Sequence, residues 1–345
     1  MNVESFAFDA PFSLKMAAKR YSPASGQDYC GGLTLMFMHC IGSHKEQWEP
    51  VIEQLFKVQR NKDVRLREAW AFDWQSHGDS AVLNREALKN RAEGVSVYEW
   101  AGAIAEFVKS PRMKGHRIIP LGHSAGAAVS ILLTKTIPPQ AFSSVVLIEP
   151  TLSTRESFES HLEDRMAAID FAVAATSTRR DHWLSREQAF GYFKKRIPWE
   201  VWDDRVIRLM TDHALEDSPS GGVNLKWDRK QEAISYADIE PHFEGALQLG
   251  RVCHSVPIHV IWGTRNDLVP EFIQDSLSDV SEGRVVASVT KVKNAGHMAS
   301  CSYLSTPAQL LTRLFPKVVQ EQPDLLARAI ASILEGLANI SRPKL

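Results

Sequence analysis

The sequence predicts an α/β protein built on a mostly parallel, doubly wound sheet, with an inserted helical cap. Short apolar runs alternate with amphipathic stretches along the chain, which favours α/β over all-α or all-β folds. The runs are apolar almost without interruption, as strands buried on both faces of a parallel sheet are. We expect residues 1–150 and 246–345 to form the core and residues 151–245 to form the cap.

Six apolar runs are the predicted parallel strands. Two segments before them, residues 5–10 and 13–21, are predicted to form an edge hairpin. Pro120 lies inside the third run and removes one hydrogen-bond donor from the sheet. The six predicted strands are residues 33–39, 68–74, 116–122, 144–149, 257–263 and 286–292.

Helices are predicted between these strands. Residues 96–109 repeat apolar side chains at helical spacing, and Ser96 with Glu99 has the spacing of a capping box. Residues 125–135 follow the third strand directly. Residues 306–315 begin with a Thr–Pro pair, which is typical of a helix start.

The predicted cap differs in composition from the rest of the chain. It is rich in Arg, Glu, Asp and Trp and lacks clear strand patterns, so we expect several helices with a loop at 216–224. Most of its four tryptophans are expected in its core, and one or two are expected to line a substrate cavity. These tryptophans are Trp183, Trp199, Trp202 and Trp227.

Ser124 is the predicted nucleophile. It lies in the stretch Gly-His-Ser-Ala-Gly, at the turn between a predicted strand and a predicted helix, which is the setting of a nucleophile elbow. Gly122 and Gly126 leave room where the strand and the helix approach each other. The helix N-terminus offers N–H groups and the positive end of a dipole to a developing oxyanion.

A serine hydroxyl needs a base, and that base needs a carboxylate to orient it. His297 follows the last predicted strand, where the base is expected. Asp267 follows strand 257–263 and completes the chain order Ser, Asp, His. Glu149, at the end of strand 144–149, is the alternative acid.

Two backbone N–H groups are expected to form an oxyanion hole. Ala125, directly after the nucleophile, supplies one of them. The loop after strand 33–39 supplies the other, from Cys40 or Ile41. Cys40 is not expected to act as a nucleophile, since no elbow presents it.

These motifs resemble those of the α/β-hydrolase fold, and the likeness covers nearly the whole chain. The segment FDWQSHGDS (72–80) is similar to the family's D-x-x-G-H-G-x-S turn, with Ser76 in place of the first glycine. Asp73, His77 and Gly78 are therefore expected to build this turn and not to react.

Two further stretches resemble a fungal subset of this family. HCIGSHKEQWEP and VVLIEP are similar to segments of peroxisomal lipase-like hydrolases and of hydrolases from AK-toxin-type host-selective toxin clusters. The predicted function is a serine hydrolase that cleaves an ester or thioester of an apolar acyl chain through an acyl-enzyme, in toxin or other secondary-metabolite biosynthesis. An acyltransferase with the same three residues, and a hydrolase-fold ligand receptor with little turnover, are the alternatives.

Bulk properties exclude several other classes. With a net charge of −1, the chain lacks the excess of basic residues that is typical of nucleic-acid-binding proteins. The four cysteines show no metal-ligand spacing, so neither a metal nor an organic cofactor is expected. No apolar run approaches the roughly 20 residues of a transmembrane helix, and the N-terminus lacks the pattern of a secretory signal.

The last three residues, Pro343, Lys344 and Leu345, resemble the C-terminal Ser-Lys-Leu peroxisomal address. The preceding helix is expected to end near Ile340, which leaves this tripeptide for an import receptor to bind. The predicted location is the peroxisome, with the cytoplasm as the alternative.

Overall fold

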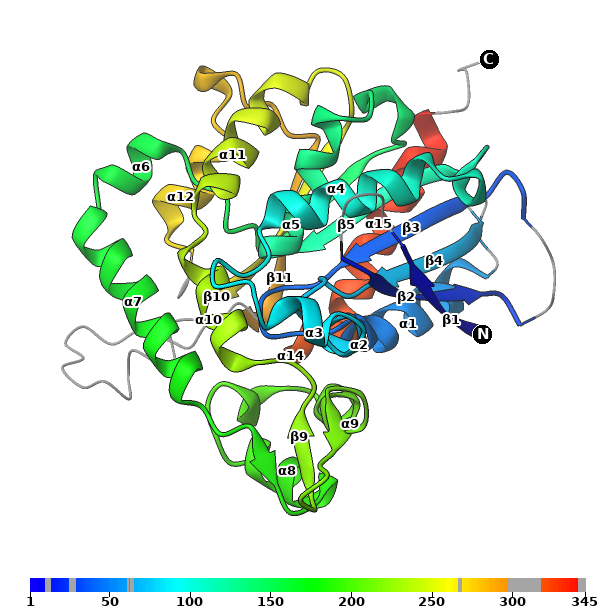
Figure 1. Cartoon of the computed structure of the whole chain (residues 1–345). Helices are drawn as coiled ribbons and strands as arrows, with labels where there is room; N and C mark the ends of the chain where they lie inside the picture. Colours follow the sequence, from blue (N-terminus) through cyan, green and yellow to red (C-terminus); the bar gives the residue numbers. More distant parts are fainter. Residues whose placement is uncertain are drawn as a thin grey trace.

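The computed structural model describes residues 1–9, 14–24, 29–60, 62, 65–265, 269–296 and 318–340. The central strands are β1 (Asn2–Phe8), β2 (Met16–Ser22), β3 (Leu33–Met38), β4 (Leu66–Phe72), β5 (Arg117–His123), β6 (Val145–Ile148), β10 (Ile258–Arg265) and β11 (Ser288–Gly296). In the described part of the chain they form one eight-stranded sheet in the order β1-β2-β4-β3-β5-β6-β10-β11 (Figure 1). The strands from β4 to β11 are parallel, and β1 and β2 add an antiparallel hairpin at one edge.

This sheet confirms the six predicted parallel strands and the predicted edge hairpin. Pro120 is tolerated in β5 because of where the neighbouring ladders run. It pairs with Met36 of β3, whereas the ladder with β6 begins only at Leu121. The missing N–H donor therefore falls before the second ladder starts.

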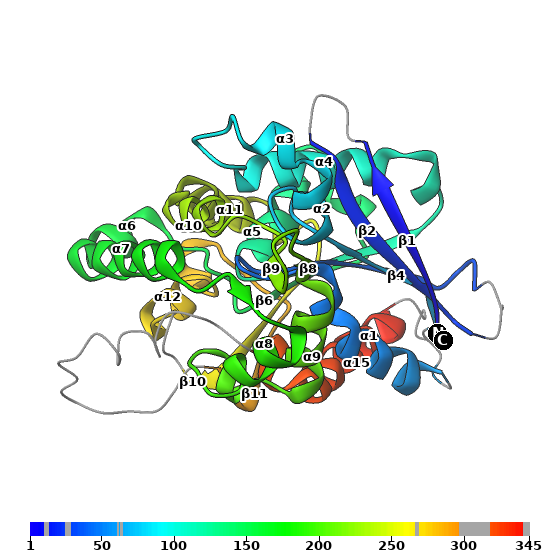
Figure 2. The ribbon, with the colours of Figure 1, turned by 60° about the horizontal axis from the view of Figure 1, so that its bottom comes forward.

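Helices cover both faces of the sheet, which makes it doubly wound (Figure 2). One face carries α1 (Glu49–Gln59) and α15 (Pro323–Ile340), and the other carries α4 (Val97–Lys109), α5 (Ala125–Leu132) and α11 (Glu240–Val252). Each set of helices buries its own apolar cluster against the strands. The shorter helices are α2 (Gly78–Leu83), α3 (Arg85–Leu88), α12 (Glu271–Ser276) and α14 (Val318–Glu321).

Two helix ends lie where the sequence predicts them. Ser96 caps α4 and forms the predicted capping box with Glu99. The last helix ends at Ile340, as expected. The predicted helix at 306–315 lies outside the described residues. No described helix has the length and apolar character that a membrane crossing requires.

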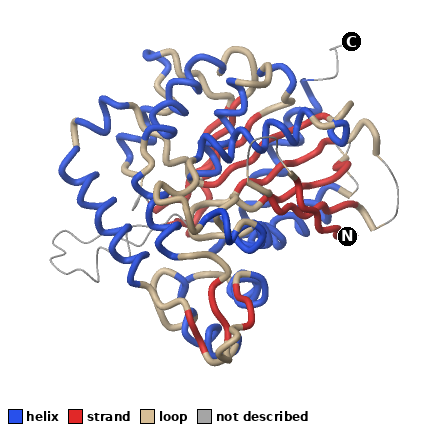
Figure 3. The backbone as a smooth tube through the Cα atoms, viewed as in Figure 1, coloured by secondary structure: helices blue, strands red, loops and turns tan. Residues whose placement is uncertain are grey.

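Residues 149–239 connect β6 to α11, and we call them the intervening segment. They contain a three-stranded antiparallel sheet in the order β7-β9-β8, so the expectation of helices without strands is wrong (Figure 3). These strands have two or three residues each, too few for an alternating pattern to show in the sequence. The elements are α6 (Arg155–Glu159), α7 (Leu162–Thr178), β7 (His182–Trp183), α8 (Arg186–Phe193), α9 (Asp204–His213), β8 (Leu215–Asp217), β9 (Val223–Leu225) and α10 (Arg229–Ala237).

The helix α11 runs without a break through the predicted cap boundary at residue 245 and packs against α5. The division into a core and a cap over 151–245 stays a prediction. The carboxyl ends of β3, β5 and β6 lie at one edge of the sheet, where residues after each strand share a cavity with α7. This edge of the sheet positions Ser124 beside the cavity.

Candidate active site

Ser124 lies at the turn between β5 and α5 in a strained backbone conformation, with φ at 55° and ψ at −115°. Its N–H donates to the carbonyl of Ile148 on β6 at 3.0 Å. A Cβ on Gly122 would lie 1.9 Å from the carbonyl oxygen of Gly126, and a Cβ on Gly126 would lie 2.3 Å from the oxygen of Met38. Only glycine fits at both positions, so the strand and helix approach as in a nucleophile elbow.

Ala125 is the first residue of α5 and is fully buried. An amide at the first helical position has no acceptor inside its own helix. The helix dipole adds positive partial charge at the same end. This placement is compatible with the predicted role of Ala125 as an oxyanion donor, which stays a prediction.

The loop after β3 borders the same cavity as Ser124 through Cys40, Ile41 and Gly42. The Gly42 N–H donates to Nε2 of His77 at 3.1 Å. This bond engages the Gly42 amide, which leaves Cys40 and Ile41 as the loop residues proposed to donate to an oxyanion.

Two buried histidines hold this loop in place. The Trp74 N–H donates to Nε2 of His39 at 3.0 Å, so His39 carries its proton on Nδ1 and donates it to the Cys40 carbonyl at 2.7 Å. By the same logic His77 accepts through Nε2 and donates from Nδ1 to the Ser76 hydroxyl at 3.0 Å. Burial lowers the pKa of His39 to about 3 and the pKa of His77 well below its usual value, so both rings are neutral at pH 7.

The Cys40 thiol is unsuited to nucleophilic attack. Burial raises the pKa of Cys40 to about 12, although the Gln320 amide lies 3.6 Å from its sulfur. Since the thiolate is the reactive form, this thiol stays protonated and inert at neutral pH.

Glu149, the alternative acid, directly follows β6 and is 2% exposed. Its φ of 45° makes it the second described non-glycine residue, with Ser124, in the left-handed region. The Gly263 N–H donates to its Oε1. Burial raises the pKa of Glu149 to about 7, and the charge of Glu321 adds to the rise. Glu149 does not belong to the described lining of the cavity that Ser124 borders.

Asp267 and His297, the predicted acid and base, lie outside the described residues. The strands that lead to them are described: β10 ends at Arg265 and β11 ends at Gly296. Both strands run parallel to β5, so they end at the same edge of the sheet as Ser124. The three-residue assignment stays a prediction.

The cavity beside Ser124 has a volume of about 650 Å³. Its walls come from the sheet edge, from α7, from the chain after α8, and from α10 and the start of α11. Trp199 and Trp202 line it, as expected for one or two of the four tryptophans. Among the described residues, no group of three or more His, Cys, Asp or Glu side chains is placed to hold a metal ion.

A buried ion pair from the intervening segment packs against the loop after β3. Arg179 donates two hydrogen bonds to Glu232, at 2.9 and 2.5 Å, and the Trp227 indole donates a third at 2.6 Å. A Cβ on Gly42, whose φ is 72°, would lie 2.5 Å from the Glu232 carboxylate. Sequence reasoning missed this contact, since 53 residues separate Arg179 from Glu232 and no local pattern links them.

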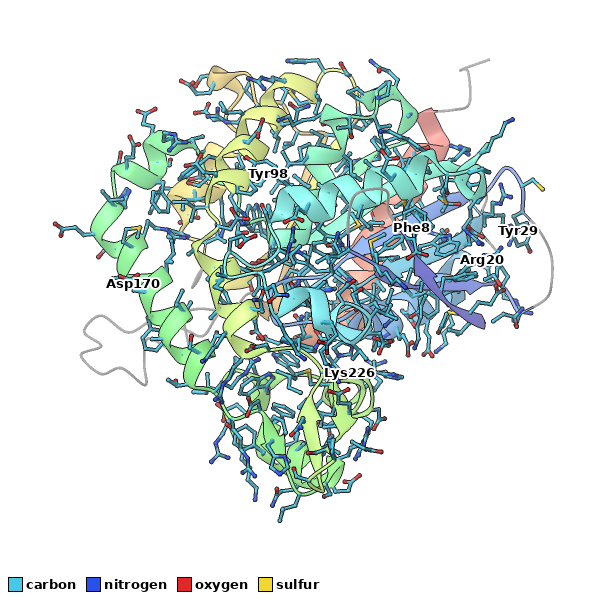
Figure 4. All side chains as sticks on the ribbon, viewed as in Figure 1. Phe8, Arg20, Tyr29, Tyr98, Asp170 and Lys226 are labelled. Carbon is cyan, nitrogen blue, oxygen red and sulfur yellow. The ribbon has the colours of Figure 1, made fainter. Side chains whose placement is uncertain are left out.

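A second charge cluster lies beside the same loop. The Lys45 ammonium is buried and lies 2.8 Å from Asp73 and 2.5 Å from Asp79. Lys226 of the intervening segment contacts Asp79 at 2.6 Å, and Figure 4 shows it where this segment meets the core. Gly78, with a φ of 52°, faces the Asp73 carboxylate, so these two residues build the turn as expected.

The comparisons with known proteins agree with this geometry. The model of a family described as the alpha/beta hydrolase family matches residues 35–313. The peroxisomal membrane protein LPX1 of Saccharomyces cerevisiae is 20% identical over 267 residues, which cover 72% of this chain and 67% of that protein. The resemblance to toxin-cluster hydrolases is not tested by these relatives and stays a prediction.

Solved structures share the fold at low identity. The peroxisomal α/β-hydrolase Lpx1 of S. cerevisiae aligns with a TM-score of 0.72 at 17% identity, covering 100% of this chain and 92% of its own. E-2-(acetamidomethylene)succinate hydrolase aligns with a TM-score of 0.68 at 18% identity, covering 97% and 100%. The thioesterase domain of the curacin biosynthetic pathway aligns with a TM-score of 0.63 at 15% identity, covering 97% and 99%.

Proposed function

Because the chain belongs to the alpha/beta hydrolase family, we propose that it is a serine hydrolase that cleaves an ester or thioester of an apolar acyl chain. The single observation that carries this proposal is the backbone of Ser124. A serine with φ at 55° lies at the turn from β5 to α5 and borders a cavity. Such strain persists only where the surrounding structure enforces it, and it is concentrated at reactive sites.

The proposed reaction has two steps. In the first, the Ser124 oxygen attacks the acyl carbonyl while His297 takes its proton and returns it to the leaving group, which departs as an alcohol or thiol. In the second, His297 takes a proton from water as the water oxygen attacks the acyl carbonyl, and it returns that proton to the Ser124 oxygen as the bond between Ser124 and the acid breaks. The amides of Ala125 and of Cys40 or Ile41 stabilise the negative oxygen in both steps.

Asp267 is the proposed partner of His297. A partner must be ionised at neutral pH to stabilise the imidazolium that forms in each step. The pKa of Glu149, at about 7, keeps a large share of that carboxyl protonated there, which favours Asp267. Asp267→Asn is expected to lower kcat far more than Glu149→Gln, and the reverse order would make Glu149 the acid.

Covalent labelling tests the nucleophile. A fluorophosphonate probe is expected to label the wild type and to fail on Ser124→Ala, with the circular dichroism spectrum unchanged. The matched control is Ser153→Ala, which removes another serine hydroxyl from the cavity lining. Labelling that persists in Ser124→Ala would contradict the proposal.

The proposed location is the peroxisome. It is supported by the likeness to a yeast protein with a peroxisomal name and by the tripeptide Pro343-Lys344-Leu345, which lies outside the described residues. A fluorescent protein fused to the N-terminus is expected to colocalise with a peroxisomal marker. Deletion of the tripeptide is expected to disperse it into the cytoplasm, and retention in peroxisomes would contradict a role for these residues.

A further inference from the structure

The cavity beside Ser124 is lined by more positive than negative side chains. Four lysines or arginines border it against two glutamates, an excess of two positive charges among the described lining residues. The lining histidine, His242, is neutral because burial lowers its pKa to about 4. The four cationic residues are Arg165, Arg179, Lys195 and Arg196.

These cations differ in whether the protein already neutralises them. Arg179 is held by the buried carboxylate of Glu232, so its charge is satisfied within the fold. Lys195 and Arg196 are exposed, and within the described part of the chain neither forms an ion pair or a side-chain hydrogen bond. Lys194, directly before them, pairs with Asp204 at 2.5 Å and does not line the cavity.

Arg196 is held in a defined position although it is exposed. Its guanidinium carbon lies 4.1 Å from the centre of the Tyr192 ring, a cation–π contact, and both residues border the cavity. Stacking uses the face of a guanidinium and leaves its N–H groups available at the edge. Those N–H groups match the paired oxygens of a carboxylate or a phosphate.

The part of the lining that α7 contributes is largely apolar, apart from Arg165, Thr176 and Thr178. Ala168, Ile169, Ala172 and Ala175 line the cavity from α7, and their spacing of three and four residues places them on one face of the helix. Asp170, on the same helix, is exposed and lies on its outer side (Figure 4). The three alanines leave space along the helix for an acyl chain, whereas Lys195 and Arg196 are exposed to solvent.

We infer that the substrate carries an anionic group in addition to its apolar acyl chain, and that Lys195 and Arg196 bind this group at the rim of the cavity. The inference rests on the proposed hydrolase function and names the substrate class of that site. The shared chemistry is a phosphate or carboxylate that stays partly hydrated, because the two cations are exposed. Its source is either the leaving group or the far end of the acyl chain.

Three thioesters with acyl chains of equal length test the inference at low ionic strength. Octanoyl-CoA carries phosphates on its leaving group, the N-acetylcysteamine thioester of octanoic acid is neutral, and that of the corresponding dicarboxylic acid carries a carboxylate on the acyl chain. The test variant is the double substitution Lys195→Gln, Arg196→Gln. Its control is Lys194→Gln, which removes one positive charge at the neighbouring position outside the cavity lining.

We expect the double variant to raise KM for an anionic substrate about tenfold, as the loss of two exposed charge contacts implies, with kcat unchanged. The neutral thioester and the Lys194→Gln control are expected to keep wild-type KM, and high salt is expected to remove the difference between variant and wild type. An effect on octanoyl-CoA places the anion on the leaving group, and an effect on the dicarboxylic thioester places it on the acyl chain.

Unchanged KM for both anionic substrates in the double variant would overturn the inference. An equal rise for the neutral thioester would also overturn it, because charge would then not be the cause. Hydrolysis of the neutral thioester by the wild type depends on the proposed function alone. Its absence, together with absent labelling of Ser124, would contradict the proposed function and not this inference about charge.

Discussion

The two walls of the cavity are built by different physical means. The Ser124 wall is defined by backbone contacts, since glycines at 122 and 126 let strand and helix meet at distances that no other residue allows. The wall from the intervening segment contains the buried ion pair Arg179–Glu232, and pairs such as Lys226–Asp79 join this segment to the core. The steric contacts at Gly122 and Gly126 exclude any larger residue, whereas the stability of the other wall depends on whether its buried charges stay paired.

Gly122→Ala is the change with the largest expected effect. Its Cβ would lie 1.9 Å from the Gly126 oxygen, and neither backbone can shift without moving Ser124. We expect a loss of at least about 4 kcal/mol in the free energy of unfolding, as for the most disruptive core substitutions, or failure to fold. Urea unfolding and the yield of soluble protein measure it.

Gly102→Ala is the matched control for that experiment. A Cβ at this exposed position in α4 would meet nothing within 4 Å. Alanine in a helix interior is more stable than glycine by roughly 0.5–1 kcal/mol, so this variant is expected to equal or exceed the wild type. Equal stability of the two alanine variants would contradict the steric description of the Ser124 wall.

Glu232→Gln tests the ion pair of the second wall. Glutamine keeps the size of the side chain and an oxygen for the Trp227 indole, but it leaves the Arg179 charge unbalanced. Removing one partner of a buried pair costs roughly 3–5 kcal/mol, and urea unfolding measures the loss. A loss below about 1 kcal/mol would show that packing and not the paired charge stabilises this wall.

The sequence predicts the Ser124 wall but not the ion pairs that form beside it. Apolar runs in the sequence predict the strands β3 to β6. The Ser124 turn is predicted by two glycines and a helix start that lie within about ten residues of each other. The contacts of Glu232 with Arg179 and of Lys45 with Asp73 join residues 53 and 28 positions apart. Charged residues at such separations carry no periodicity, and only the folded chain reveals which of them meet.

The alternative acid shows a further limit of sequence patterns. The position of Glu149 after β6 fits either a catalytic or a structural carboxyl. Its burial and the resulting rise of its pKa to about 7 depend on how β6 and β10 pack, which no short motif encodes.

Glu149→Gln is expected to change stability in a pH-dependent manner. The pKa of this carboxyl is about 7 in the folded protein and close to its ordinary value, roughly 4.3, in the unfolded chain. Its contribution to stability is therefore fully present below about pH 4 and is lost as pH rises through 7. Glutamine stays neutral and keeps an oxygen for the Gly263 N–H.

The two proteins are expected to unfold at similar urea concentrations near pH 4.5. By pH 8 the variant is expected to be more stable by about 3 kcal/mol, from the linkage of about 1.4 kcal/mol per pH unit. Glu86→Gln, at an exposed side chain, controls for the loss of one negative charge. A difference that does not grow with pH would contradict the buried, protonated state of Glu149.

Arg85→Gln is expected to change the free energy of unfolding the least. Arg85 of α3 contacts Glu216 of β8 at 2.5 Å, so this pair also joins the core to the intervening segment, but its side chains are 47% and 28% exposed. Exposed pairs contribute about 0.2–1 kcal/mol, less at high salt, and we expect a loss in that range by urea unfolding. Glu232→Gln removes a charge from a pair within the intervening segment whose side chains are only 15% and 1% exposed, so the ratio of the two losses measures the effect of burial. If Arg85→Gln cost as much as Glu232→Gln, the second wall would depend on the number of its ion pairs and not on the buried one beside Gly42.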